Sequence, residues 1–188
     1  MAAAGHRRER LLGSMRAQSS RFVLENDPQL IAPLVEMMQE DLAGVGLCDT
    51  TGLMRVGVAL QEVLANALYH GYLEVDSERR QDDERVYHAE ADRRRHQAPY
   101  RSRSIHVDAS LDRDAATYVV RDEGPGFDTS ILDRPIDPED IVRIGGRGFL
   151  LIRTFMDEVS FNPDENRITL IKYGRGRRPE AIAPGGPR

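Results

Sequence analysis

Hydrophobic positions in the first part of the chain alternate over one short stretch and then recur at helical spacing. Alternating apolar side chains predict a short strand at residues 20–25. An Asn-Asp-Pro sequence then supplies a capping residue and a proline suited to a first helical turn, which predicts a helix over about residues 28–44. A second apolar stripe with helical period follows residues 49–51 and predicts a helix that ends at Gly71.

Residues 76–103 form a charge-dense block in which acidic and basic side chains nearly cancel. Opposite charges stand at helical separations, which favours a solvent-facing helix supported by weak ion pairs and ended by Pro99. A helix that docks a partner is the alternative interpretation of this block.

The remaining pattern predicts a hairpin, a loop, one helix and a closing pair of strands. The expected ranges are strands at 104–111 and 116–120 around a turn at 112–114, a mobile loop at 128–144, a helix at 148–156, and strands at 159–161 and 168–171. Together these elements predict an α+β fold, a two-layer sandwich in which a mixed, mostly antiparallel sheet carries helices on one face.

Composition narrows the class of protein. The chain has 188 residues, 40% hydrophobic and 30% charged, which fits a single domain with a substantial core. The net charge of −5 gives no general attraction to nucleic acid or to an anionic membrane, so direct binding to either is not expected. Cys48 is the only cysteine, which excludes an intramolecular disulfide and a cysteine-rich zinc site. We expect it to pack rather than react.

The two ends of the chain differ from its middle. Residues 1–18 are polar and Arg-rich, and residues 174–188 combine Gly, Pro and Arg, so both are predicted to be disordered tails around a folded domain at 19–173. The basic start is not followed by the apolar block of a secretory signal, and no window resembles a transmembrane helix. A cytoplasmic protein is therefore expected.

The second predicted helix carries the first group of candidate functional residues. Glu62, Asn66 and His70 are spaced four apart and share one helical face, beside the apolar stripe. An ordinary polar helix edge has the same pattern. His70 is expected to be a helix-end residue rather than a metal ligand, because no second histidine stands at ligand spacing.

A glycine-containing loop follows the second hairpin strand. Asp122 comes at the strand end, where its carboxylate can accept a hydrogen bond from an amine, and Gly124 and Gly126 permit a ligand to approach the backbone closely. A plain turn is the alternative interpretation.

A second glycine-rich segment opens the helix predicted at 148–156. Gly146 and Gly148 leave the backbone amides of the helix N-terminus accessible, and Arg143 and Arg147 add positive charge, so a phosphate could be held there. The alternative is a flexible glycine hinge before a core helix.

The order of these three segments resembles a known superfamily. LQEVLANALYHGY, VRDEGPGF and GGRGFLLIRTFMDEV look like the N box and the two glycine boxes of the GHKL ATPases, which share the Bergerat fold of gyrase and histidine-kinase ATP-binding domains. The likeness spans about residues 20–173 and is greatest to the bacterial anti-sigma-factor serine/threonine kinases.

The resemblance implies roles for the matching residues. Asn66 would ligate Mg²⁺ through its amide oxygen, and Glu62 would be the general base that takes a proton from a serine hydroxyl. Asp122 would accept from the adenine amine of ATP, beside Gly124 and Gly126. Gly146 and Gly148 would let the loop close over the phosphates, where Arg143 and Arg147 also stand.

The resemblance also implies partners. The leading hypothesis is a kinase that phosphorylates an anti-anti-sigma protein of the STAS type and sequesters a sigma factor, with dimers formed as in many members of that group. A non-catalytic, nucleotide-dependent binding module in a partner-switching or two-component pathway is the alternative. A detached histidine-kinase catalytic domain is the third.

Three features depart from the family pattern. Asn166-Arg167-Ile168-Thr169 stands where a Gly-Thr pair usually leads into the last strand, which places the contact between that strand and the phosphates in question. Pro125 stands inside the first glycine box and restricts Gly124. The block at 76–103 is longer than the family's connection at this point, and we expect it to recognise a partner.

Overall fold

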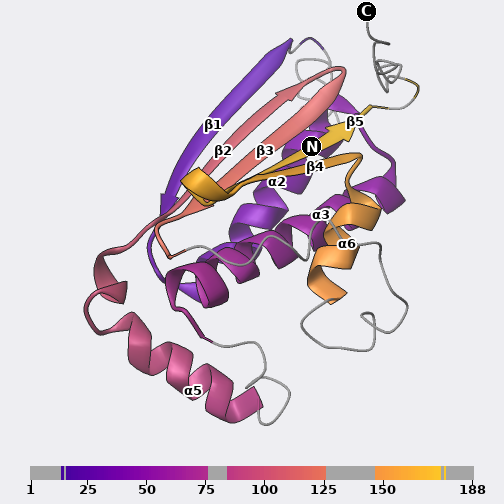
Figure 1. Cartoon of the computed structure of the whole chain (residues 1–188). Coiled ribbons are helices and arrows are strands. Elements are labelled where there is room, and N and C mark those ends of the chain that lie inside the picture. The colour runs from indigo at the N-terminus through magenta and orange to yellow at the C-terminus, as the bar shows by residue number, and fades with distance from the viewer. Residues whose placement is uncertain (1–13, 15, 76–83, 126–146, 175, 177–188) are drawn as a thin grey trace, which may run out of the picture.

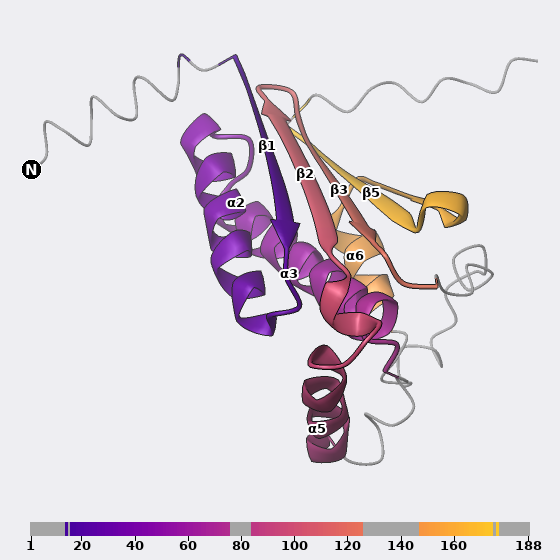
Figure 2. The same cartoon turned by 90° about the vertical axis from the view of Figure 1, so that its left-hand side faces the viewer.

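The computed structural model describes residues 14, 16–75, 84–125, 147–174 and 176, which form an α+β sandwich of two layers (Figure 1). One layer is a twisted sheet, and the other consists of helices that lie against one face of it. A view turned by 90° separates the two layers and shows the helix of the charged block extending beyond the end of the sandwich (Figure 2). The predicted fold class is confirmed.

Within the described residues the sheet has five strands in the order β1-β2-β3-β5-β4, and each neighbouring pair is antiparallel. The strands are β1 (Ala17–Leu24), β2 (Ile105–Asp112), β3 (Ala115–Asp122), β4 (Glu158–Asn162) and β5 (Arg167–Tyr173). The expectation of a mixed sheet was therefore wrong for the described strands. β4 runs parallel to β3, but β5 lies between them and is antiparallel to both.

The strands were predicted at the correct places, but all except the one expected at 104–111 were predicted too short. β1 begins at Ala17, so the sheet takes in residues that had been assigned to an N-terminal tail ending at residue 18. The hairpin turn forms because the carboxylate of Asp112 accepts from the backbone N–H groups of Asp114 and Ala115, both at 2.8 Å. This Asx turn lies where a turn is predicted, at residues 112–114.

In the part of the chain that the structure describes, three α-helices form the second layer, at the positions that the apolar period predicts. They are α2 (Ile31–Val45), α3 (Thr50–Asn66) and α6 (Arg147–Phe155). A 3₁₀ turn at Pro28–Leu30, capped by Asp27, precedes α2, and Gly46 ends α2 with a φ of 68°. Asp49 caps α3 by accepting from the backbone N–H of Gly52 at 2.7 Å.

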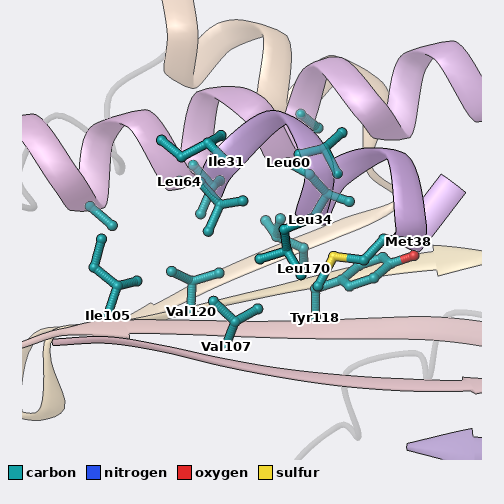
Figure 3. Close-up of a cluster of buried hydrophobic side chains, with 14 of the residues drawn as sticks. Ile31, Leu34, Met38, Leu60, Leu64, Ile105, Val107, Tyr118, Val120 and Leu170 are labelled. Carbon is teal, nitrogen blue, oxygen red and sulfur yellow. The ribbon is translucent and has the colours of Figure 1, made fainter. Parts of the chain in front are cut away.

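The core lies between the two layers, where side chains from α2 and α3 meet the inward residues of β2, β3 and β5 (Figure 3). The residues labelled there are Ile31, Leu34, Met38, Leu60, Leu64, Ile105, Val107, Tyr118, Val120 and Leu170. Because strand side chains alternate between faces, Asp122 lies on the same, helix-facing side of β3 as Tyr118 and Val120. The core pattern therefore directs the carboxylate of Asp122 toward the helices, at the end of the sheet.

The charged block forms α5 (Glu84–Arg95), and the prediction of a solvent-facing helix was only partly right. Tyr87 and Ala91 are 1% and 5% exposed, so α5 has a buried face. The ring of Tyr87 packs 5.4 Å from that of Tyr69. The helix also ends at Arg95, before Pro99. Residues 76–83 of the block lie outside the described part of the chain.

Candidate functional site

Asp122 is the last residue of β3, and its carboxylate is held by two donors. The backbone N–H of Gly124 donates to Oδ1 at 2.9 Å, and the side-chain amide of Asn166 donates to the same oxygen. The residue is half-buried. Burial raises the pKa of the carboxyl, and the hydrogen bonds from Gly124 and Asn166 oppose that rise because they favour the charged form. The site therefore presents a partly desolvated carboxylate acceptor.

Two glycines make room for this carboxylate. A Cβ built on Gly71 would collide with the carboxylate of Asp122, and a Cβ built on Gly124 would collide with the backbone carbonyl of Gly71. Gly71 belongs to η2 (Ala67–Tyr72), a π-helical extension of α3. The end of this helix and the loop after β3 are therefore in direct backbone contact, which only residues without side chains allow.

We expect Gly124→Ala to destabilise the protein by about 1–3 kcal/mol, because the new methyl group would require one of two backbone segments to move. Urea unfolding monitored by circular dichroism measures this change. Pro125→Ala, at the exposed neighbouring position, is the matched control and is expected to change stability by less than about 0.5 kcal/mol. Equal stability of the Gly124 variant and the wild type would contradict the described contact.

Glu62 and Asn66 lie together on the face of α3 that packs against α6. A Cβ built on Gly148 would come within 2.5 Å of Glu62 Oε2 and 3.8 Å of Asn66 Nδ2. The first turn of α6 can therefore approach these two side chains only because residue 148 is glycine. A carboxylate and an amide oxygen are hard donors of the type that Mg²⁺ accepts.

His70 does not share the surroundings of Glu62 and Asn66. Its Nδ1 lies 2.8 Å from the backbone carbonyl of Val75, and its ring lies 6.5 Å from that of Tyr87. The four-residue spacing places His70 on the same face only in a regular α-helix. The wider π-helical turn that begins at Ala67 interrupts that spacing.

The two parts of the candidate site are joined by the helix that carries them. Gly71 follows Asn66 by five residues in one helical run, which corresponds to at most about 7.5 Å along the axis. Asp122 with its glycines, and Glu62 with Asn66 and Gly148, therefore lie at one end of the sandwich. Three segments that are far apart in the sequence meet there.

Several predicted residues lie outside the described part of the chain. Gly126, Arg143 and Gly146 are among them. The backbone of Arg147 opens α6, and the position of its side chain is not described. The expected mobile loop at 128–144 also falls outside. The predicted phosphate contacts of these residues stay predictions.

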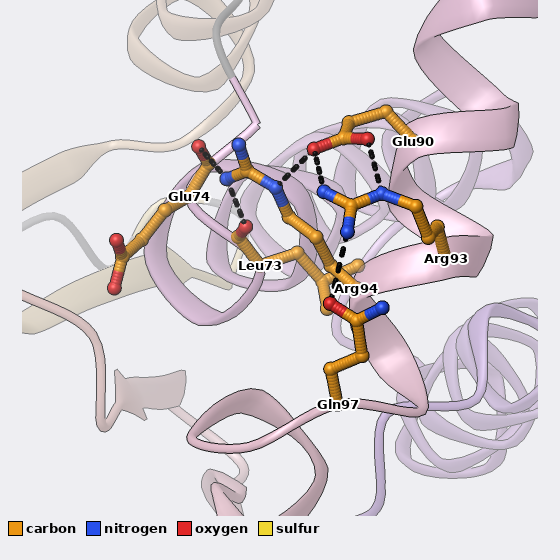
Figure 4. A network of polar contacts seen from close by, with 6 residues as sticks. All are labelled: Leu73, Glu74, Glu90, Arg93, Arg94 and Gln97. Atoms are coloured by element: carbon orange, nitrogen blue, oxygen red, sulfur yellow. Dashed lines mark hydrogen bonds and ion pairs between the residues drawn. The ribbon is translucent and has the colours of Figure 1, made fainter.

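Hydrogen bonds from two arginines, which the sequence analysis did not single out, hold the segment after Gly71 in place. Arg94 of α5 donates to the backbone carbonyls of Leu73 and Glu74 at 2.9 and 2.6 Å and pairs with Glu90 (Figure 4). Arg103 donates to the carbonyl of Tyr72 at 2.7 Å. Its positive charge also lowers the pKa of Asp122, which opposes the effect of burial.

Asn166, which departs from the family pattern, lies at the site beside Asp122. It follows the short 3₁₀ turn Pro163–Glu165 with a φ of 48°, a left-handed conformation that asparagine tolerates better than most residues. Val120 pairs with Ile168 in the antiparallel register of β3 and β5. Continuing this register by two residues places position 166 opposite Asp122. Strand register was the signal that could have identified it.

Two hollows among the described residues lie away from this site. One of about 630 Å³ is at the opposite end of α3, where Cys48, Arg55 and Lys172 contribute to its wall. Lys172 there pairs with Asp157 at 3.2 Å. Among the described residues, every helix is too short or too polar to span a bilayer.

A one-sided α+β sandwich with a half-buried carboxylate at a strand end and an Asn-Glu helix face is the arrangement expected from the GHKL resemblance of the three motif segments. The family comparison agrees, since the model of the histidine kinase-like ATPase domain matches residues 24–172. The chain belongs to this family, and thereby to the GHKL superfamily with its Bergerat fold. A search of curated proteins finds no match.

Proposed function

We propose that the protein is an ATP-dependent serine/threonine protein kinase of the anti-sigma-factor type. Its substrate would be a Ser or Thr on a STAS-type anti-anti-sigma protein, and it would also sequester a sigma factor. The observation that carries the proposal is the placement of the Glu62 carboxylate beside Asn66, at the first turn of α6. A protein kinase needs a general base beside the γ-phosphate, whereas a module that only binds nucleotide does not.

The adenine end of the proposed ATP site is formed by Asp122 and its two glycines. Gly71 and Gly124 keep side chains away from the Asp122 carboxylate, since a Cβ at Gly71 would collide with that carboxylate and one at Gly124 with the backbone of Gly71. Asp122 would accept from the exocyclic amine of adenine. This acceptor is half-buried, so it is partly shielded from competing water.

The phosphate end would be formed by Asn66, Glu62 and the N-terminus of α6. When bound, Mg²⁺ would neutralise phosphate charge and align the γ-phosphoryl group. Asn66 would hold the ion through its amide oxygen, with the phosphates and water as further ligands. Glu62 would accept the hydroxyl proton of the substrate serine. At the same time the serine oxygen would bond to the γ-phosphorus, and the bond between that phosphorus and the β–γ bridging oxygen would break to release ADP.

Incubation with labelled ATP, Mg²⁺ and candidate STAS proteins tests the proposal. Phosphate found on a serine or threonine of the STAS protein supports it. Tight nucleotide binding without transfer to any STAS protein would favour the non-catalytic module instead. Label on a histidine of another protein would favour a detached histidine-kinase domain.

Calorimetry tests the assigned contacts separately. We expect Asp122→Asn to weaken ATP binding by roughly 10- to 100-fold, because a charged acceptor is replaced by an amide that can also present a donor. Asn66→Ala should weaken only the Mg²⁺-dependent part of the affinity. Unchanged affinity in both folded variants would remove the site assignment.

A further inference from the structure

Asn166 and Gly124 both donate to Oδ1 of Asp122. Neither of these two donors bonds to the other oxygen, Oδ2. The Asn166 amide also lies 3.4 Å from the backbone carbonyl of Asp122, so it bridges the side chain and the main chain of one residue. The plane of the carboxylate is thereby fixed, with one oxygen occupied by the protein and one left as an acceptor.

From this arrangement we propose that Asn166 is a positioning residue that turns Oδ2 of Asp122 toward the exocyclic amine of the base and so sets the preference for adenine. The proposal rests on the proposed nucleotide-binding function. It adds a determinant of base specificity from the β4–β5 connection, which none of the three motif segments contains.

The chemistry of the site explains why a second donor matters. A carboxylate held by one hydrogen bond can rotate and exchange its oxygens, whereas two donors on one oxygen select a single orientation. A base that carries an oxygen in place of the amine, such as hypoxanthine, would set an acceptor against Oδ2 and be rejected. A site built around a polar contact discriminates strongly for this reason, because a mismatched ligand leaves buried groups unpaired.

The left-handed backbone at Asn166 determines the choice of variants. Asn166→Gly removes the amide and keeps a residue that adopts a positive φ without strain. Asn166→Asp keeps the size of the side chain but sets a second carboxylate beside Asp122. Glu165→Gln is the matched control, since Glu165 is in the same turn and pairs with Arg167 rather than with Asp122.

Affinities for ADP and IDP, measured by calorimetry on the full chain, test the proposal. The wild type and Glu165→Gln are expected to prefer ADP. Asn166→Gly should lose roughly tenfold in ADP affinity, with little change for IDP, so that the ADP/IDP ratio falls by the same factor. Asn166→Asp should lose at least as much, and it serves as the test if the Gly variant is unfolded by circular dichroism.

The outcomes separate this inference from the proposed function. An ADP/IDP ratio that is unchanged in a folded Asn166 variant, while the wild type binds ADP, would overturn the role of Asn166 and leave the nucleotide site standing. A wild-type chain that binds neither nucleotide would overturn both. An equal fall in affinity for ADP and IDP would show a structural role instead of a positioning one.

Discussion

Replacing Glu62 by Gln is expected to reduce phosphoryl transfer to the substrate protein by roughly 10²- to 10⁴-fold, the usual contribution of a general base. The amide keeps the size and much of the polarity of the side chain, so the contact with Gly148 and the packing of α3 on α6 should persist. What is lost is the ability to accept the proton of the serine hydroxyl. ATP affinity should therefore change by less than about threefold, corresponding to about 0.6 kcal/mol.

The measurement is the initial rate of label transfer at saturating ATP, with ATP affinity taken from calorimetry on the same preparations. Gln61→Ala is the matched control, because Gln61 is the preceding residue of α3 and is exposed. Transfer by Glu62→Gln at the wild-type rate would show that another group takes the proton. A parallel loss of rate and ATP affinity would instead assign Glu62 to nucleotide binding.

The local pattern of the sequence predicted most elements because their causes are local. Apolar residues at helical period and capping by Asp49 determine where α3 lies, and the Asx turn at Asp112 determines where the hairpin reverses. The burial of one face of α5 was not predictable in this way. It depends on the contact of Tyr87 with Tyr69, and the sequence around Tyr87 is dominated by charge.

The antiparallel pairing of the whole described sheet was also beyond local reasoning. Local patterns do not show that β5, rather than β4, lies next to β3. Either arrangement would bury the same alternating residues. The sequence indicated that the last two strands pair with each other. It did not indicate which of them lies against β3.

The same distinction between local and long-range contacts applies to the candidate site. Motif spacing brought Glu62 and Asn66 together, because four residues on a helix is a local relation. It failed for His70, where the helix widens, and it missed Asn166 and Gly71, whose contacts with Asp122 join segments more than forty residues apart. Residues that complete a site from a distant strand or helix end have no local signature except the register of the sheet.

The helix that carries Glu62 and Asn66 is held by the core, and we expect Leu60→Ala to lower the free energy of unfolding by about 2–5 kcal/mol. Leu60 is 0% exposed and lies between α3 and the sheet (Figure 3), so its truncation removes apolar contacts and leaves a cavity. Val58→Ala is the matched control, because Val58 is on the same helix and is 40% exposed. Urea unfolding should show a change below about 0.5 kcal/mol for the control. A similar, small change in both variants would mean that α3 is not packed as described, and the placement of Glu62 beside Gly148 would then lose its support.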